Sequence, residues 1–152
     1  MAAVRRLGKG DSEAARALNR LFAEVFEDEA SYASAPSSQA YLDRLLSRDG
    51  LIILVAEDDG TLVGGLVAYV LEKLEQERSE IYIYDLAVAE GHRRQGVATA
   101  LIAELQVIAT QIGAWVIYVQ ADYGDDPAMA LYEGLGARED VMHFDIPPPT
   151  TR

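Results

Sequence analysis

The sequence predicts a single-domain α/β fold in which about four helices flank a central, mixed, mostly antiparallel sheet. Helix-like and strand-like apolar patterns alternate along the 152 residues, and one strand, helix, strand unit in the second half suits parallel pairing. Half of the residues are apolar, enough for a sizeable core. We expect the domain to cover residues 1–146 and the proline-rich residues 147–152 to form a flexible tail.

The first third of the chain predicts a short strand and two amphipathic helices. The strand lies near Val4 to Leu7, and Asp11 can cap the helix that follows. The apolar residues of this helix recur at intervals of three and four: Ala14, Leu18, Leu21, Phe22, Val25 and Phe26. A second helix begins near Ser38 and ends before Gly50, and we expect it to cover a sheet.

The middle of the chain predicts antiparallel strands. A strand from Leu51 to Ala56, the turn at residues 58–60 and a strand from Leu62 to Leu71 have the order of a hairpin. Gly64 and Gly65 suggest a bulge in its second strand. A charged connection over 72–78 then leads to a strand over 80–88.

The last third predicts two helices and two strands. A helical pattern runs from Gly96 to a stop at Gly113, and residues 115–120 have the composition of a buried strand. Pro127 suits the first turn of a helix that ends around Gly136. The segment from Val141 to Ile146 predicts a final strand.

Composition limits the possible partners and location. The 13 basic and 25 acidic residues give a formal charge of −12, so we expect neither a nucleic acid nor a membrane as partner, and a small polycation is a plausible substrate. Acidity is also a common route to solubility. The absence of cysteine excludes disulfides and thiolate chemistry, and no apolar run suits a leader or a membrane span. These features favour a cytoplasmic protein.

The turn between residues 92 and 99 is the most informative segment for chemistry. It joins a strand to the start of a long helix, where unpaired N–H groups and the helix dipole attract phosphate oxygens. Gly96 and Ala98 leave the backbone approachable, and Arg93 and Arg94 add positive charge. A basic turn before a helix is often only a connection, so this pattern needs its context.

Two motifs supply that context. The residues Arg93-x-x-Gly96-x-Ala98, directly after Asp85-Leu-Ala-Val88, resemble the (Gln/Arg)-x-x-Gly-x-(Gly/Ala) signature of GNAT acetyltransferases. Further on, Ala128-x-x-Leu-Tyr132-Glu-x-Leu-Gly136 resembles the second motif of that family. Asp125 replaces a frequent asparagine, and Ala137 stands where an aromatic residue often follows the glycine.

The resemblance implies a GNAT fold, a cleft where strands four and five splay apart, and acetyl-CoA as co-substrate with no metal. It places the pantetheine arm along the backbone of Leu86, Ala87 and Val88. The phosphates would bind at Arg93, Arg94, Gln95, Gly96, Val97, Ala98 and Thr99. It further implies direct acetyl transfer to a neutral amine, with Tyr132 as the proton donor to the departing thiolate. A tyrosine that only packs against the sheet is the simpler alternative.

Direct transfer also needs a general base, and we predict Asp85 for this role. It lies in an apolar and aromatic strand, where a bare carboxylate needs a reason, although a structural carboxylate that accepts backbone hydrogen bonds is the alternative. Glu80 and Asp122 are reserve candidates. His92 and His143 lack metal-ligand spacing, and we interpret both as structural.

Most of the chain resembles, within that family, the aminoglycoside 3-N-acetyltransferases of the gentamicin-resistance type. The similar segments are residues 69–71, 78–88, 92–96, 116–127 and 141–145, together with the first helix. This resemblance implies acetylation of the 3-amino group of the deoxystreptamine ring, antibiotic resistance and a homodimer.

The candidate substrate-binding residues are acidic or aromatic, as a polycationic sugar requires. They are Glu27, Asp28, Asp122, Asp125 and Asp126 in two acidic clusters, and the tyrosines Tyr84 and Tyr123, with Tyr32 as a further flanking ring. Acidic runs are also typical of solvated loops, and tyrosines of packing. Two other functions remain open: acetylation of a polyamine or a protein amino group, and a catalytically silent acyl-CoA-binding module.

Overall fold

The computed structural model describes residues 2–150, which divide after Gln120 into two compact units. The first unit contains, in chain order, β1 (Ala3–Arg6), α1 (Ser12–Val25), α2 (Glu29–Tyr32), α3 (Gln39–Leu46), β2 (Leu51–Asp58), β3 (Thr61–Glu72), β4 (Ser79–Val88), the 3-10 turn η1 (Glu90–His92), α4 (Val97–Ile112) and β5 (Val116–Val119). The second unit contains α5 (Asp126–Glu133). No helix within the described residues has the length and apolar character needed to cross a bilayer.

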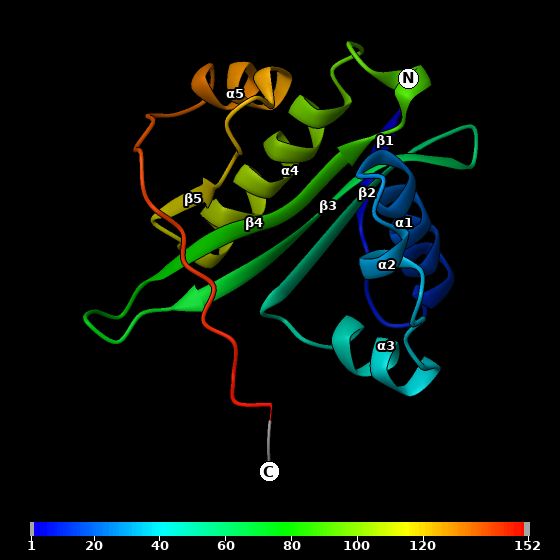
Figure 1. Cartoon of the computed structure of the whole chain (residues 1–152), viewed down its shortest axis with the longest axis horizontal. Helices are drawn as coiled ribbons and strands as arrows, with labels where there is room; N and C mark the ends of the chain where they lie inside the picture. Colours follow the sequence, from blue (N-terminus) through cyan, green and yellow to red (C-terminus); the bar gives the residue numbers. More distant parts are fainter. Residues whose placement is uncertain (1, 151–152) are drawn as a thin grey trace. The chain divides into compact units, whose positions relative to one another are not determined.

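The sheet has the order β1-β2-β3-β4-β5, as Figure 1 shows. The first four strands pair antiparallel, and β4 pairs parallel with β5 after the crossover through α4. The β4–β5 register covers only Glu80–Ile83 against Val116–Val119, so residues 84–88 of β4 continue without a β5 partner. This confirms the predicted mixed sheet, with its fourth and fifth strands paired over only part of their length.

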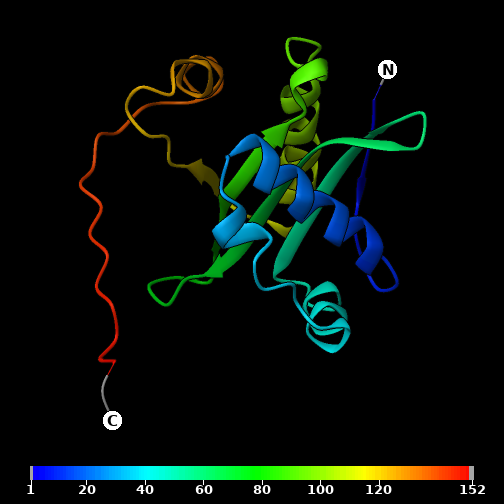
Figure 2. The same cartoon turned by 45° about the vertical axis from the view of Figure 1, so that its right-hand side comes forward.

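Two adjacent glycines on β3 let helices approach opposite faces of the sheet. A Cβ atom on Gly65 would lie 2.4 Å from Cδ1 of Leu18 on α1, and one on Gly64 would lie 2.9 Å from Cγ1 of Val97 on α4. Because successive strand residues face opposite ways, α1 and α4 cover different faces (Figure 2). The predicted bulge in this strand falls beside them, at Val63, where the register with β2 shifts.

Each face of the sheet has its own layer of buried apolar side chains. On the α1 face, Leu18, Phe22, Leu42 and Leu46 pack with sheet residues that include Val55. On α4, the residues at helical spacing are buried: Val97, Leu101, Ile102, Leu105, Ile108 and Ala109. The apolar periodicity that predicted these helices therefore marks the faces that they bury.

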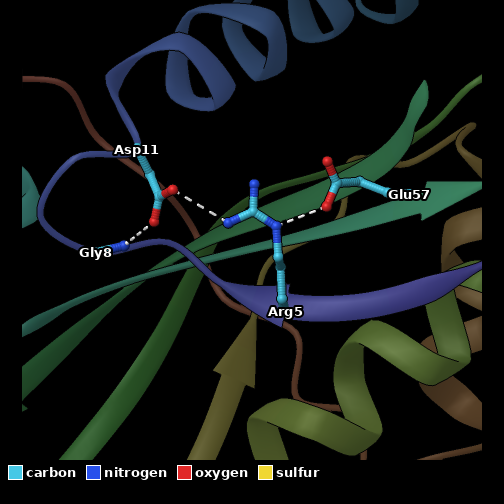
Figure 3. Close-up of polar contacts among 4 residues, drawn as sticks. All are labelled: Arg5, Gly8, Asp11 and Glu57. Atoms are coloured by element: carbon cyan, nitrogen blue, oxygen red, sulfur yellow. Dashed lines mark hydrogen bonds and ion pairs between the residues drawn. The ribbon is translucent and has the colours of Figure 1, made fainter. Parts of the chain in front are cut away.

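Arg5 connects the first strand to the second strand and to the start of α1 (Figure 3). Its Nε donates to Glu57 Oε1 at 2.6 Å and its Nη1 to Asp11 Oδ1 at 3.2 Å. Asp11 also accepts from the Gly8 amide at 2.8 Å. Asp11 thus occupies the N-cap position as predicted, but its carboxylate faces the preceding loop and makes no cap hydrogen bond to the helix.

Ser38 is a true cap, since its hydroxyl accepts from the Tyr41 amide at the start of α3. The structure adds α2, a one-turn helix that the sequence did not predict because four residues carry no periodicity.

Three expectations for the last third of the chain are wrong. The strand over 115–120 is not buried, because Trp115 is 57% exposed and β5 residues are exposed or half-buried. The last helix ends at Glu133 rather than around Gly136, with Gly134 as its C-cap and only turn hydrogen bonds to Tyr132 beyond it. The segment 141–146 forms no strand, because a strand needs a hydrogen-bonded neighbour and the five-stranded sheet does not include it.

Candidate active site

Asp85 lies at a bulge where β4 loses its regular register with β3. Val67 pairs with Asp85 and Ala68 with Ile83, so Tyr84 is the extra residue of the bulge. A bulge re-aims the side chains beside it. Asp85 is half-buried, and the Tyr32 hydroxyl donates to its Oδ1 at 2.7 Å. Burial raises the pKa of Asp85, and the Tyr32 hydrogen bond opposes that shift.

A cavity of about 150 Å³ lies beside this carboxylate, within the first unit. Its wall is formed by α1, α3 and strands β2 to β4; the lining residues include Leu18, Asn19, Phe22, Leu45, Val67, Tyr69 and Asp85. Asp85 is the single acidic residue in this lining. The cavity, which we call the carboxylate cavity, therefore joins apolar and aromatic walls to one charge.

A row of tyrosine rings continues from this cavity across three strands. Tyr69 on β3 meets Tyr84 edge-on at 6.0 Å between ring centroids, and Tyr84 meets Tyr82 at 5.8 Å. Tyr82 stacks on Tyr118 of β5 at 4.7 Å. Tyr84 is 62% exposed, so its ring is accessible, and its contact with a sugar stays a prediction.

Backbone conformation, rather than side chains, defines the turn between η1 and α4. Arg94 and Gly96 have φ angles of 62° and 78°, in the left-handed region, and Gly96 makes no side-chain cap to the helix. Left-handed residues followed by the first amides of a helix form a backbone arrangement that can bind a phosphate group. Arg93 Nε donates to the Val88 carbonyl at 3.4 Å, which ties this 93–99 turn to the end of β4.

The residues predicted for the cofactor fit an acetyl-CoA site to different degrees. Leu86, Ala87 and Val88 belong to the part of β4 without a β5 partner. Val97 is buried, so only its backbone can serve a ligand, whereas Gln95 and Thr99 are exposed. The donor set of amides and arginines is of the kind that a pyrophosphate needs.

The acidic residues before α2 have local roles. Asp28 is the N-cap of α2, and its Oδ1 accepts from the Ser31 amide at 3.0 Å. Glu27 is exposed and has a φ of 51° at the end of α1. The structure therefore explains Asp28 as a helix cap, whereas Glu27 is an exposed carboxylate that follows α1.

The other predicted residues belong to the second unit. Asp125 caps α5 by accepting from the Ala128 amide at 3.4 Å. Tyr123 donates to Asp140 at 3.3 Å, and Asp122 and Asp126 are exposed. Burial, and next the Asp125 carboxylate, raise the pKa of Tyr132, so this phenol stays protonated at neutral pH.

The reserve base and the histidines have other partners. Glu80 Oε2 forms an ion pair with Lys73 Nζ at 2.7 Å, so its carboxylate already has a partner. His92 lies 3.5 Å from Asp58, and His143 lies 2.8 Å from Asp145. Among the described residues, no group of three or more potential ligands could hold a metal ion.

The sequence did not reveal the partner of Asp85. Tyr32 was expected only as a ring beside a sugar, whereas its hydroxyl binds a carboxylate 53 positions away. Tyr32 lies at the end of α2, and this four-residue helix is too short to show a periodic pattern in the sequence.

The acetyltransferase (GNAT) family model matches residues 15–137, so the chain belongs to this family. An aminoglycoside acetyltransferase, HMB0005, from an uncultured soil metagenomic sample superposes with a TM-score of 0.96 and 49% identity, over 98% of this chain and 99% of that one. Another from a soil metagenomic sample, meta-AAC0020 in complex with sisomicin, gives 0.90 and 33%, over 97% of each chain.

A mycothiol acetyltransferase of Kocuria rhizophila is 33% identical over 112 residues, which are 71% of this chain and 34% of that protein. The chain thus spans about a third of the length of this relative. The family match and the two structural similarities extend over both units, and the matched residues include Asp85 and the 93–99 turn.

Proposed function

We propose that the chain is an acetyl-CoA-dependent N-acetyltransferase that modifies the 3-amino group of aminoglycoside antibiotics and so confers resistance. The observation that carries this proposal is the half-buried Asp85 carboxylate, at the bulge of β4 beside the carboxylate cavity. The similarity to HMB0005 over almost the whole chain supports the acceptor class. The 3-amino position rests on the resemblance of residues 78–88 and 116–127 to enzymes of that specificity.

Asp85 has the properties of a base for an ammonium acceptor. An amine attacks only when neutral, so it must first give up a proton, and the raised pKa of Asp85 makes it a better acceptor than an ordinary aspartate. The tyrosine rings beside it provide flat surfaces for a sugar ring. A single carboxylate among neutral walls also attracts one ammonium group of a polycation.

The co-substrate supplies a thioester whose acetyl group passes to the amine nitrogen with release of the CoA thiol. The end of β4 that pairs with β3 but has no β5 partner would hold the pantetheine arm, and the 93–99 turn would hold the phosphates. The ammonium group gives one proton to Asp85 before the attack, and the nitrogen loses a second proton to solvent as the amide forms. Tyr132, the residue that matches the second family motif, would give its proton to the sulfur and recover one from solvent.

The acidic residues Glu27, Asp28, Asp122, Asp125 and Asp126 remain proposed contacts for further ammonium groups, and Asp28 and Asp125 keep their capping roles. A homodimer and a cytoplasmic location are part of the proposal, since the resembling enzymes pair and acetyl-CoA is an intracellular metabolite.

The test is thiol release from acetyl-CoA with gentamicin, spermidine or a lysine-rich peptide as acceptor. Release that is much faster with gentamicin, and a product whose NMR spectrum places the acetyl group on the 3-amino nitrogen, is the expected result. Acetylation at another amine of gentamicin would contradict only the 3-amino position. A response to only spermidine or the peptide would contradict an aminoglycoside as the acceptor. Binding of acetyl-CoA without thiol release would contradict the proposed catalytic activity.

A further inference from the structure

We propose that Tyr32 is a positioning residue for the general base: its hydroxyl holds one oxygen of Asp85 so that the other faces the acceptor amine. This inference rests on the proposed role of Asp85. It assigns to α2, which follows the longer helix α1, the task of orienting a carboxylate on β4.

The hydrogen bond from Tyr32 makes the two carboxylate oxygens of Asp85 different from each other. Tyr32 Oη lies 2.7 Å from Asp85 Oδ1, within the range of strong O–H···O⁻ bonds. Asp85 also lines the carboxylate cavity. Because the phenol engages Oδ1, Oδ2 is the oxygen available to take a proton from an ammonium group.

The ring of Tyr32 is fixed independently of its hydroxyl. Its centroid lies 5.7 Å from that of Phe22 and 5.6 Å from that of Phe26, and these two rings stack on each other at 5.4 Å. Asp28 caps the helix that carries the ring. A phenylalanine at position 32 would keep this packing, so packing alone does not explain the hydroxyl.

The groups around Asp85 determine how the Tyr32 hydroxyl affects its pKa. Three neighbouring hydroxyls interact electrostatically with Asp85: Tyr32 on α2, Tyr69 on β3 and Tyr82 on β4. Other groups act on these tyrosines: Tyr84 on all three, Asp28 on Tyr32, and Tyr41 and Arg48 on Tyr69. The α1 residues in the cavity wall, Leu18, Asn19 and Phe22, are uncharged. Burial raises the pKa of Asp85 and the Tyr32 bond lowers it.

Tyr32 itself stays protonated over the working range. Burial first, and then its bond to Asp85, raise the pKa of its phenol far above the ordinary value. It therefore remains a donor at any pH at which the enzyme is assayed. Without this donor, the Asp85 carboxylate would lose the interaction that favours its ionised form.

The test compares Tyr32→Phe with the matched control Tyr41→Phe, which removes an equivalent hydroxyl from the exposed Tyr41 of α3. For Tyr32→Phe we expect kcat/KM with gentamicin to fall about tenfold at pH 7, the scale of a hydrogen bond to a charged group. The acidic limb of its pH profile should move to higher pH, because the pKa of Asp85 rises. Tyr41→Phe should match the unmodified enzyme in both.

An unmoved acidic limb in Tyr32→Phe would overturn the positioning role, whatever the loss of rate. If the variant is too slow to assay, carboxyl ¹³C NMR follows Asp85 directly, and an unchanged titration midpoint would overturn the inference. Full activity of Asp85→Asn would instead remove the base, and with it the proposed mechanism. A slow Asp85→Asn with an unmoved limb in Tyr32→Phe would contradict the inference alone.

Discussion

Side chains define the carboxylate cavity, whereas backbone conformation defines the 93–99 turn. At the cavity, the proposed chemistry depends on Asp85 and Tyr32, which belong to elements far apart in sequence. At the turn, the proposed phosphate binding depends on the left-handed residues Arg94 and Gly96 and on the start of α4. We therefore predict that an isosteric substitution at the cavity lowers turnover, and that a substitution with another backbone preference at the turn weakens acetyl-CoA binding.

The largest effect is expected from Asp85→Asn, which keeps the shape of the side chain and removes the base. Turnover should fall by about two orders of magnitude or more, the usual scale for an acid–base group. The acetyl-CoA dissociation constant, measured by calorimetry, should not change. Glu80→Gln is the matched control and should retain near-normal turnover, because Glu80 pairs with Lys73. Near-normal turnover of Asp85→Asn would remove the base assignment.

The second effect tests the backbone-defined region. Gly96→Val places a β-branched residue at a φ of 78°, a strain of about 1–3 kcal/mol. We expect acetyl-CoA to bind roughly ten- to a hundredfold more weakly, and turnover at saturating acetyl-CoA to change less. Gly91→Ala is the control, because Gly91 has open space around its Cβ position and no positive φ. Equal affinities for both variants would show that the turn does not hold the phosphates.

The third effect compares the supports of the two regions. The new Cβ of Gly65→Ala would press against α1 and lie 2.9 Å from the Leu54 carbonyl, whereas that of Gly64→Ala would lie 2.9 Å from the Val97 side chain of α4 and 3.2 Å from the Ala87 carbonyl. We expect both to lower the free energy of unfolding by about 1–3 kcal/mol, with the larger loss for Gly65→Ala because backbone cannot move aside. Urea denaturation measures this, and Gly8→Ala, in open space, is the control. The reverse order would contradict the packing described here.

The smallest effect is a stability change with pH. Burial raises the pKa of Asp85 in the folded state, so the stability that this residue contributes is present below its unfolded value and is lost as the pH rises through its folded value. Asp85→Asn should therefore melt at a higher temperature than the unmodified protein at pH 8, and this difference should shrink toward pH 4. A constant difference would show that ionisation of Asp85 costs no stability.

The sequence predicted the parts of the fold that have long periodic patterns. The apolar spacing in α1 and α4 and the turn at residues 58–60 each specify their element locally. It missed α2, whose cap Asp28 resembles an ordinary acidic surface residue. It also predicted a strand over 141–146, where alternation is present but strand pairing is not.

For the site, the sequence proposed Asp85 and the 93–99 turn as candidates, because a carboxylate in an apolar strand and a glycine before a helix are visible in the chain itself. The bond between Tyr32 and Asp85 was not predictable, since it depends on where α2 lies against the sheet.

The sharpest test of Asp85 as the general base is the pH dependence of kcat/KM for gentamicin, measured for the unmodified enzyme and for Asp85→Asn. We expect the unmodified enzyme to have an acidic limb above the usual range of an aspartate, because burial raises the pKa of Asp85. This limb should be absent from the variant. An identical limb in both proteins would show that another group accepts the proton and would contradict the role of Asp85.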